Sequence, residues 1–344
     1  MASGASRPPL VSVVFPIRNE AGHIAASLDA VLAQDYPPDR MEVIVADGMS
    51  GDGTREIVLR YGARDPRVRL IDNPGRIVPT GLNAALRAAQ GAVIVRVDGH
   101  TLIERSYVSE AVAALGRTGA DVVGGNMSAA GRTAFGRAVA LATSTPAGVG
   151  GSAFHYKEAE GPAESVYMGV FRRDVFERFG LFDAGLVRNQ DDEFNYRVRE
   201  RGGRICLVPS LRSTYAPRES PSKLFRQYFQ YGLYKVRVAL LHPRMMRSRH
   251  VVPAAFVLAL ASLAAASWFS SVALVVLGAL LAAHALAALL FSARSAARDP
   301  AAWLLVPATT LILHVAYGSG FAAACVAALA GRTPGAEPAR GGAS

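Results

Sequence analysis

The sequence predicts an α/β domain with a mostly parallel sheet, followed by an α-helical transmembrane domain. Strand-like apolar runs alternate with helix-periodic segments between residues 10 and 98, which is typical of a parallel sheet covered by helices. Hydrophobic residues make up 51% of the 344-residue chain, a high share for a soluble protein. Most of this surplus follows His250, so a membrane domain is expected there.

Two of the predicted strands end in an aspartate that is followed by glycine. Strands are expected at 10–15, 41–47, 68–72 and 92–98, and helices at 20–34, at 54–63 and in the segment up to residue 90. Asp47 and Asp98 each close a strand and are each followed by Gly. Ligands of open parallel sheets bind beyond the carboxyl ends of the strands. Asp-Gly is also common turn chemistry, but two such pairs at strand ends favour a ligand site.

The pattern becomes looser after residue 100. The sequence predicts a helix at 106–115, a strand at 120–126 and a helix at 172–180. Residues 145–165 are rich in Gly, Ser and Pro and are expected to form a mobile substrate loop. A further helix is predicted from about Asp191 to Arg201, where Gly202 and Gly203 end it.

The C-terminal third predicts membrane attachment. Residues 221–241 mix aromatic side chains with Arg and Lys at helical spacing, which suits a helix in the membrane interface; an amphipathic helix packed on the domain is the alternative. Three later runs are each long enough to cross a bilayer, at 251–269, 272–291 and 303–330. The expected organisation is a disordered 1–9, a catalytic domain 10–217, an amphipathic region 218–250, a transmembrane domain 251–330 and a disordered tail 331–344.

Arginines on both sides of the first two runs predict their orientation. Arg244, Arg247 and Arg249 precede this hairpin and Arg294 and Arg298 follow it, so both flanks are expected inside. The N-terminus lacks an apolar core of signal-peptide length. We therefore expect a multi-pass protein of the bacterial inner membrane with a cytoplasmic catalytic domain.

The third apolar run is expected to cross once and carry the tail outside. Pro307 and the Gly318/Gly320 pair leave a re-entrant or double-pass element as the alternative.

The formal net charge of +10 favours anionic lipid and phosphate-bearing substrates as partners. Nucleic acid is the competing partner, but no zinc-finger spacing or RNA-binding aromatic signature supports it. We therefore expect no nucleic-acid partner. Cys206 and Cys325 lie in a predicted strand and an apolar run, so neither a disulfide nor a zinc site is expected.

Several motifs resemble the family 2 glycosyltransferases, and within them the ExoA-type enzymes of succinoglycan and related exopolysaccharide synthesis. They are VSVVFPIRNEAGHIAASLDAVLAQDYP, MEVIVADGMSGDGT, NPGRIVPTGLNAALRAAQGAVIVRVDGHT and NQDDEFNYRVRERGGRI, within residues 10–240. The resemblance implies a GT-A fold, a nucleotide-sugar donor, a UDP nucleotide by family habit, and inversion at the sugar.

The resemblance also assigns nucleotide-binding residues. The loop Pro16–Glu20, with Arg18 inside it, and Asp47 would hold the nucleoside, Asp47 accepting a hydrogen bond from the base and Glu20 lying on the ribose side. Arg76 and Asn83 lie where the family closes over the nucleotide, and Asp98 completes the set.

In the family an Asp-x-Asp motif holds a divalent cation, and the matching triplet here is Asp98-Gly99-His100. Asp98 would ligate Mg²⁺ or Mn²⁺, and His100 in place of the second acid favours Mn²⁺. A surface turn residue is the alternative interpretation of His100.

The family places its catalytic base in a Glu-Asp pair at the start of a helix. The alignment puts Asp191 at the base position, with Gln190 in place of the Glu and Asp192 as a possible second acid. Acids that merely favour a helix N-terminus are the alternative.

The segment RQYFQYG (226–232) resembles a shortened Gln-x-x-Arg-Trp motif of processive synthases. Gln227 matches, but Gln230 and Tyr231 replace Arg-Trp, which disfavours a long-polymer synthase. Arg226 and Lys235 remain candidates for contact with a diphosphate.

The expected function is transfer of a single sugar to a polyprenyl-diphosphate-linked saccharide during exopolysaccharide or cell-envelope synthesis. Transfer to polyprenyl phosphate is one alternative, and an inactive nucleotide-binding membrane scaffold is another.

Overall fold

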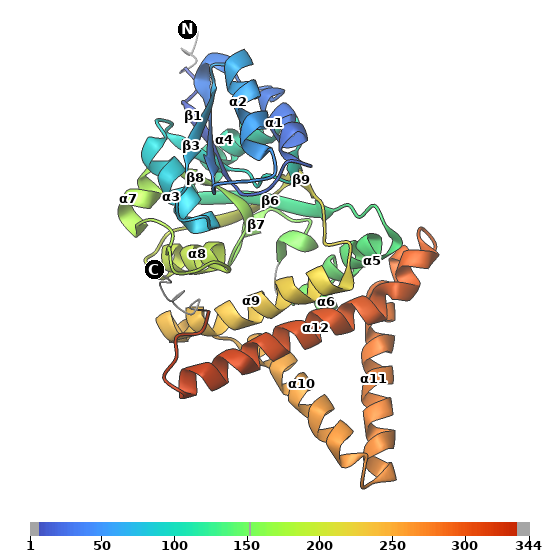
Figure 1. Cartoon of the computed structure of the whole chain (residues 1–344). Helices are drawn as coiled ribbons and strands as arrows, with labels where there is room; N and C mark the ends of the chain where they lie inside the picture. The colour runs from blue at the N-terminus through green and yellow to red at the C-terminus, as the bar shows by residue number, and fades with distance from the viewer. Residues whose placement is uncertain (1–6, 151–152, 336–344) are drawn as a thin grey trace. The chain divides into compact units, whose positions relative to one another are not determined.

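The structure, a computed structural model, describes residues 7–150 and 153–335 and consists of two compact units (Figure 1). The first unit comprises Met1–Ser128 and Ser152–Ala216, and the second comprises Ala129–Gly151 and Pro217–Ser344. The sequence prediction placed 129–151 in the catalytic domain, whereas these residues group with the C-terminal helices. Two segments, 1–9 and 331–344, were expected to be disordered, and residues 1–6 and 336–344 of these lie outside the described residues. Arg7, in contrast, forms an ion pair with Asp39.

Within the described residues, the first unit contains a nine-stranded mixed sheet. Four neighbouring strands are parallel, in the order β3 (Val68–Asp72), β2 (Met41–Asp47), β1 (Val11–Ile17) and β4 (Val93–Arg96). The order continues with β8 (Tyr167–Arg172), β6 (Val122–Ala129), β9 (Ile205–Tyr215) and β5 (Thr101–Ile103), and β7 (Gly161–Pro162) pairs with β9. Strand β8 is antiparallel to both β4 and β6. The predicted α/β fold is confirmed, and its parallel part is the first four strands.

Helices cover both faces of this sheet. Side chains of α1 (Ile24–Leu32), α2 (Thr54–Arg64) and α4 (Tyr107–Thr118) form one core with the sheet, and those of α3 (Val78–Ala88), α7 (Asp174–Phe179) and α8 (Gln190–Glu200) form the other. All seven residues of β1 are buried, with Val13 in the first core and Val14 in the second. A strand buried on both faces needs a continuous apolar run. Ser12 is the one hydroxyl residue within β1, and Arg18, Asn19 and Glu20 follow in the loop at its carboxyl end.

The second unit is helical. It contains α5 (Ala134–Thr143), α6 (Pro146–Val149), α9 (Pro221–Leu241), α10 (Ser248–Ala266), α11 (Ser271–Phe291) and α12 (Pro300–Leu329). Among the described residues, α10, α11 and α12 are the three helices long and apolar enough to cross a membrane. Helix α12 is continuous through Pro307, Gly318 and Gly320, so it is not broken into two short elements.

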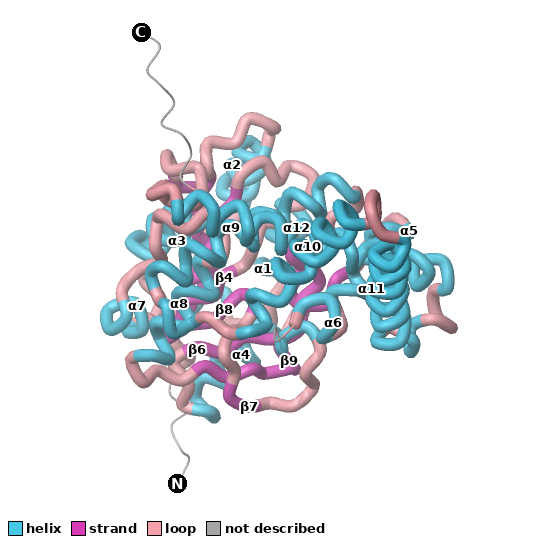
Figure 2. The backbone as a smooth tube through the Cα atoms, turned by 90° about the horizontal axis from the view of Figure 1, so that it is seen from below, coloured by secondary structure: helices cyan, strands magenta, loops and turns pink. Residues whose placement is uncertain are grey.

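Helices α9 and α12 lie side by side (Figure 2). A Cβ atom added at Gly232 would lie 2.0 Å from the Tyr317 carbonyl oxygen, and one added at Gly320 would lie 2.0 Å from the Phe229 carbonyl oxygen. Small residues permit such backbone approach between membrane helices. The sequence places a glycine on each helix at the contact, and this is why the pair can pack so closely.

We expect Gly320→Ala to destabilise the second unit by about 1–3 kcal/mol, because the new methyl group must displace the backbone of α9. Gly278 on α11 is the matched control, because a Cβ there meets nothing within 4 Å. Thermal unfolding of the detergent-solubilised variants measures the difference. Equal midpoints for Gly320→Ala and Gly278→Ala would show that this contact does not stabilise the unit.

Candidate active site

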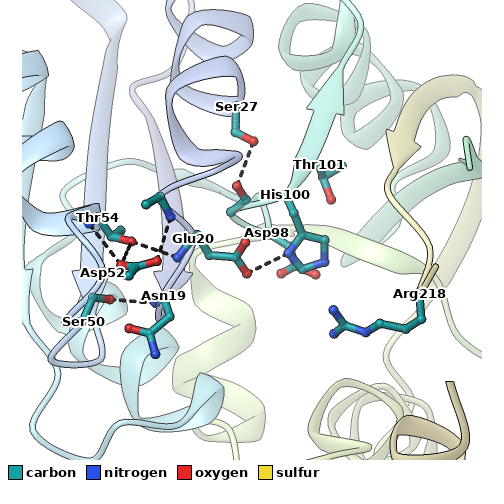
Figure 3. Close-up of polar contacts among 12 residues, drawn as sticks. Asn19, Glu20, Ser27, Ser50, Asp52, Thr54, Asp98, His100, Thr101 and Arg218 are labelled. Atoms are coloured by element: carbon teal, nitrogen blue, oxygen red, sulfur yellow. Dashed lines mark hydrogen bonds and ion pairs between the residues drawn. The ribbon is translucent and has the colours of Figure 1, made fainter. Parts of the chain in front are cut away.

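The loops that follow β1 and β2 are joined by hydrogen bonds at the carboxyl edge of the parallel strands (Figure 3). The Asn19 amide donates to Ser50 Oγ at 2.8 Å, and the Glu20 amide donates to Thr54 Oγ1 at 2.8 Å. In return, the Gly51 amide donates to Asn19 Oδ1 at 3.1 Å. The two motifs that the sequence separates by thirty positions therefore form one rigid polar rim.

Asp47 closes β2 and is fully buried. Its carboxylate accepts from the Ser50 hydroxyl at 2.5 Å, the Ser50 amide at 3.1 Å and Arg55 Nη1 at 3.1 Å, and Arg55 also pairs with Asp72 at 2.8 Å. A carboxylate has about four acceptor positions. These three bonds occupy most of these positions and hold the buried Asp47 in place.

The other residues predicted to bind nucleotide differ in their surroundings. Pro16 lies inside β1, and Arg18 is exposed and donates to the Arg76 carbonyl oxygen at 3.4 Å. The Asn83 amide group donates to the Phe182 carbonyl at 2.8 Å and accepts from the Phe182 amide at 3.0 Å. Asn83 is buried, so in this structure it holds the segment that leads to α8.

The triplet Asp98-Gly99-His100 follows β4 and is fixed by its backbone. The buried Ser27 hydroxyl donates to the Gly99 carbonyl at 3.0 Å. A Cβ at Gly99 would lie 2.9 Å from Ile17 and 3.0 Å from Glu20. Glycine between the two polar residues is thus required for the triplet to approach the loop after β1.

His100 is oriented by Glu20. Its Nδ1 lies 2.9 Å from Glu20 Oε1, and both side chains are about one-fifth exposed. A histidine that donates from Nδ1 to a carboxylate carries its lone pair on Nε2, the arrangement found around metal-binding histidines. The Tyr215 ring lies 5.3 Å from the His100 ring and limits its rotation.

Arg96 connects the two acids that the sequence assigned to separate functions. Its Nε donates to Asp98 Oδ1 at 3.0 Å, and its Nη1 lies 3.7 Å from Asp191 Oδ2. Arg96 is buried. One guanidinium therefore brings the end of β4 and the start of α8 into a single site. The sequence analysis did not select Arg96, and its position two residues before Asp98 was the available signal.

Asp191 lies in the first turn of α8, with 39% of its side chain accessible to solvent. Burial among protein groups raises the pKa of its carboxyl, Arg96 opposes this effect, and Asp192 and Asp98 add to the rise. A carboxylate of raised pKa that is still accessible can accept a proton from an incoming hydroxyl. Asp192 contributes its backbone amide, which donates to Asp191 Oδ1 at 3.0 Å.

The position of α8 is set by an internal ion pair. Arg197 binds both oxygens of Glu193, at 2.8 Å and 2.9 Å, and also donates to the Leu181 carbonyl at 2.9 Å. Such bidentate pairs fix orientation as well as distance. Arg197 thus fixes the position of α8, the helix that carries Asp191.

Arg226, Gln227 and Lys235, predicted to contact a diphosphate, belong to α9 of the second unit. Arg226 is exposed and Lys235 is buried. Gln227 accepts from Arg218 at 3.2 Å and donates to the Tyr231 hydroxyl at 2.9 Å.

The donor set beyond β4 fits a divalent cation in part. Asp98 offers carboxylate oxygen and His100 offers imidazole nitrogen, a combination suited to Mn²⁺. No group of three or more His, Cys, Asp or Glu side chains in the described ranges could hold a metal ion. A cation here would therefore take its remaining ligands from water or from donor phosphates.

The chain is similar to curated glycosyltransferases. It is 34% identical to the succinoglycan biosynthesis protein ExoA of Rhizobium meliloti, over 71% of this chain and 74% of that protein. It is 28% identical to the glycosyltransferase AglE of Haloferax volcanii, over 68% of this chain and 75% of that protein.

A solved structure shares the fold. The mannosyltransferase PcManGT of Pyrobaculum calidifontis, determined with GDP-Man and Mn²⁺, aligns with a TM-score of 0.57 and 22% identity, over 91% of this chain and 88% of that chain. Residues 12–180 match the family described as glycosyl transferase family 2. This match and the extended similarity to ExoA show that the chain is a glycosyltransferase and a member of family 2.

Proposed function

We propose that this protein transfers one sugar, with inversion, from a nucleotide-sugar to a lipid-linked saccharide. The observation that carries the proposal is the Arg96 bridge between Asp98 and Asp191. Inversion needs one in-line attack by an acceptor hydroxyl, with a carboxylate that takes its proton. Asp191 is the base, and Arg96 holds it beside Asp98, the acid that follows β4.

The donor is bound by the loops at the carboxyl edge of the sheet. The rim formed by Asn19, Glu20 and Ser50 supports the nucleoside, and the buried Asp47 holds Ser50 in this rim. Exposed Arg18 and Arg76 supply positive charge for the diphosphate. UDP is the nucleotide that we propose.

The cofactor that we propose is a divalent cation, Mn²⁺ or Mg²⁺, held by Asp98 and His100. When bound, it neutralises the negative charge that builds up on the departing diphosphate. Glu20 keeps the His100 ring in the orientation that presents Nε2.

The acceptor that we propose is a polyprenyl-diphosphate-linked saccharide in the bacterial inner membrane, approached from the cytoplasmic side. The similarity to a succinoglycan biosynthesis protein supports an oligosaccharide product, and the apolar helices support a lipid carrier. Purified protein should transfer labelled sugar to polyprenyl-diphosphate-saccharides and leave polyprenyl phosphate unlabelled. Labelling of polyprenyl phosphate alone would replace this acceptor with the lipid itself.

Replacing Arg96 by glutamine is expected to move the acidic limb of the pH–rate profile to higher pH. Activity needs ionised Asp191, and Arg96 is the group that lowers the pKa of that carboxyl. Without its charge the pKa rises further, so Asp191 stays protonated to a higher pH. Arg96→Lys keeps the charge and should shift the limb less. An unchanged limb in Arg96→Gln would mean that Asp191 does not control the rate.

A further inference from the structure

Helix α12 contacts the short helices α5 and α6 along its first half. Arg137 of α5 donates to Asp299 at the start of α12, at 2.5 Å. Val139 and Leu313 belong to one buried cluster. Farther along, His314 Nε2 lies 2.9 Å from the Ala147 carbonyl oxygen of α6.

The second half of α12 contacts α9 through close backbone packing, apolar side chains and a hydrogen bond. Gly320 lies against the Phe229 backbone, Phe321 shares a buried cluster with Val236, and the Tyr234 hydroxyl donates to the Gly335 carbonyl at 2.9 Å. Both helices run in the same direction, since later residues of α9 meet later residues of α12. One side of α12 is thus lined by α5 and α6 in its first half and by α9 in its second half, and α10 and α11 also contact this helix.

Helices α5 and α6 must stay on the catalytic side of the membrane. They lie in Ala129–Gly151, an insertion whose two ends return to the first unit. Each crossing of the hydrocarbon core needs about 20 apolar residues, so this insertion is too short to cross and come back. Any part of α12 that packs on α5 or α6 is therefore near the catalytic side as well.

Helix α9 cannot cross the membrane either. It follows β9 directly and carries Lys223, Arg226, Lys235 and Arg237 at intervals along its length. Charged side chains spread in this way are expensive in the hydrocarbon core. They suit a helix that lies in the membrane surface. Because α12 is paired with α9 over many residues, it must lie at the same depth.

We propose that α12 lies along the membrane surface together with α5 and α9, and that only the hairpin of α10 and α11 crosses the bilayer. Figure 1 shows α12 beside α9, with α10 and α11 extending away from both. The most apolar window of α12 is 33% buried inside the protein, against 6% for α10 and for α11. Residue 333 is then on the same side as the catalytic domain, which differs from the single crossing that the sequence alone predicts.

The exposed side chains agree with this placement. Leu304, Val326 and Leu329 are exposed apolar residues on α12 that would face acyl chains. At the turn of the hairpin, Trp268 and Phe269 are almost fully exposed. Aromatic residues concentrate where a membrane meets water. Helices α10 and α11 are each about 30 Å long at 1.5 Å per residue, which matches the hydrocarbon core.

Cysteine labelling in intact spheroplasts tests the side on which α12 ends. Ser271→Cys, Ala297→Cys and Thr333→Cys place single exposed thiols at the hairpin turn, between α11 and α12, and after α12. We expect a membrane-impermeant maleimide to distinguish Ser271→Cys from the other two, which should behave alike. The parent chain, with Cys206 and Cys325, gives the background. Thr333→Cys behaving like Ser271→Cys would overturn the proposal, whichever way the protein is inserted.

Depth measurement separates a surface helix from a re-entrant or crossing one. Spin labels at Leu304→Cys and Val326→Cys are about 33 Å apart along the helix axis. In nanodiscs, paramagnetic quenching should place both at one shallow depth, while a label at Leu258→Cys on α10 lies deeper. A large difference in depth between the two α12 labels would contradict the proposal.

Discussion

Replacing Asp191 by asparagine is expected to remove nearly all sugar transfer and to leave nucleotide affinity almost unchanged. The base contacts the acceptor hydroxyl rather than the nucleotide, and loss of general-base help costs about 10²–10⁴-fold. Single-turnover transfer assays and calorimetric titration with UDP measure the two quantities separately.

Asp192→Asn is the matched control for this substitution. It removes the neighbouring carboxylate of the same helix turn, and its side chain points about 100° away around the helix. We expect it to retain most of the activity. Should Asp192→Asn be inactive and Asp191→Asn active, the base would be Asp192 and the alignment would be shifted by one residue.

Replacing Asp98 by alanine is expected to abolish metal-dependent donor binding. Asp98, which follows β4, is the proposed carboxylate ligand, and its loss also leaves Arg96 without its partner at 3.0 Å. His100→Ala should weaken binding less and should shift the preferred cation from Mn²⁺ toward Mg²⁺, because only oxygen donors would remain.

Donor affinity measured over a series of Mn²⁺ and Mg²⁺ concentrations gives both results. Glu20→Gln is an informative companion, because it keeps the size of the side chain that orients His100 and removes its charge. Full transfer activity in excess chelator would rule out a required cation.

The parallel half of the sheet could be predicted closely from sequence. Strands β2 and β3 have the bounds expected from their sequences, because each is a short segment rich in β-branched residues and ended by Asp. Strand β8 was not predicted, since its YMGVFR segment includes Gly169, which weakens the strand pattern. Its pairing with β4 and β6 is non-local and leaves no periodic signal.

The part of the candidate site that could be predicted consists of acids found in recognisable motifs. Asp98 and Asp191 were selected by motif, and the structure places both beside Arg96. Arg96 itself was missed because a single charge in an apolar strand reads as a solvent-facing residue. The contact of Asn83 with the nucleotide stays a prediction. Its amide donates to the Phe182 carbonyl, a partner ninety-nine positions away that the sequence alone cannot reveal.

In the second unit, the sequence could not predict which helices pack against one another. Residues 134–143 are apolar but short, and the partner that orders them is α12, far along the chain. Hydropathy identifies α12 as a possible span, and it contains no information about which neighbours cover the helix. The greater burial of α12 inside the protein is the property that distinguishes it from α10 and α11.

The stereochemistry of the product tests the central claim most directly. Purified protein is given a UDP-α-sugar that it accepts and a polyprenyl-diphosphate-linked saccharide, and the new linkage is determined by the anomeric coupling constant in NMR. A single displacement assisted by Asp191 predicts a β-linkage, lost in Asp191→Asn. An α-linked product would contradict the proposed mechanism, because retention requires a different sequence of steps from one in-line attack.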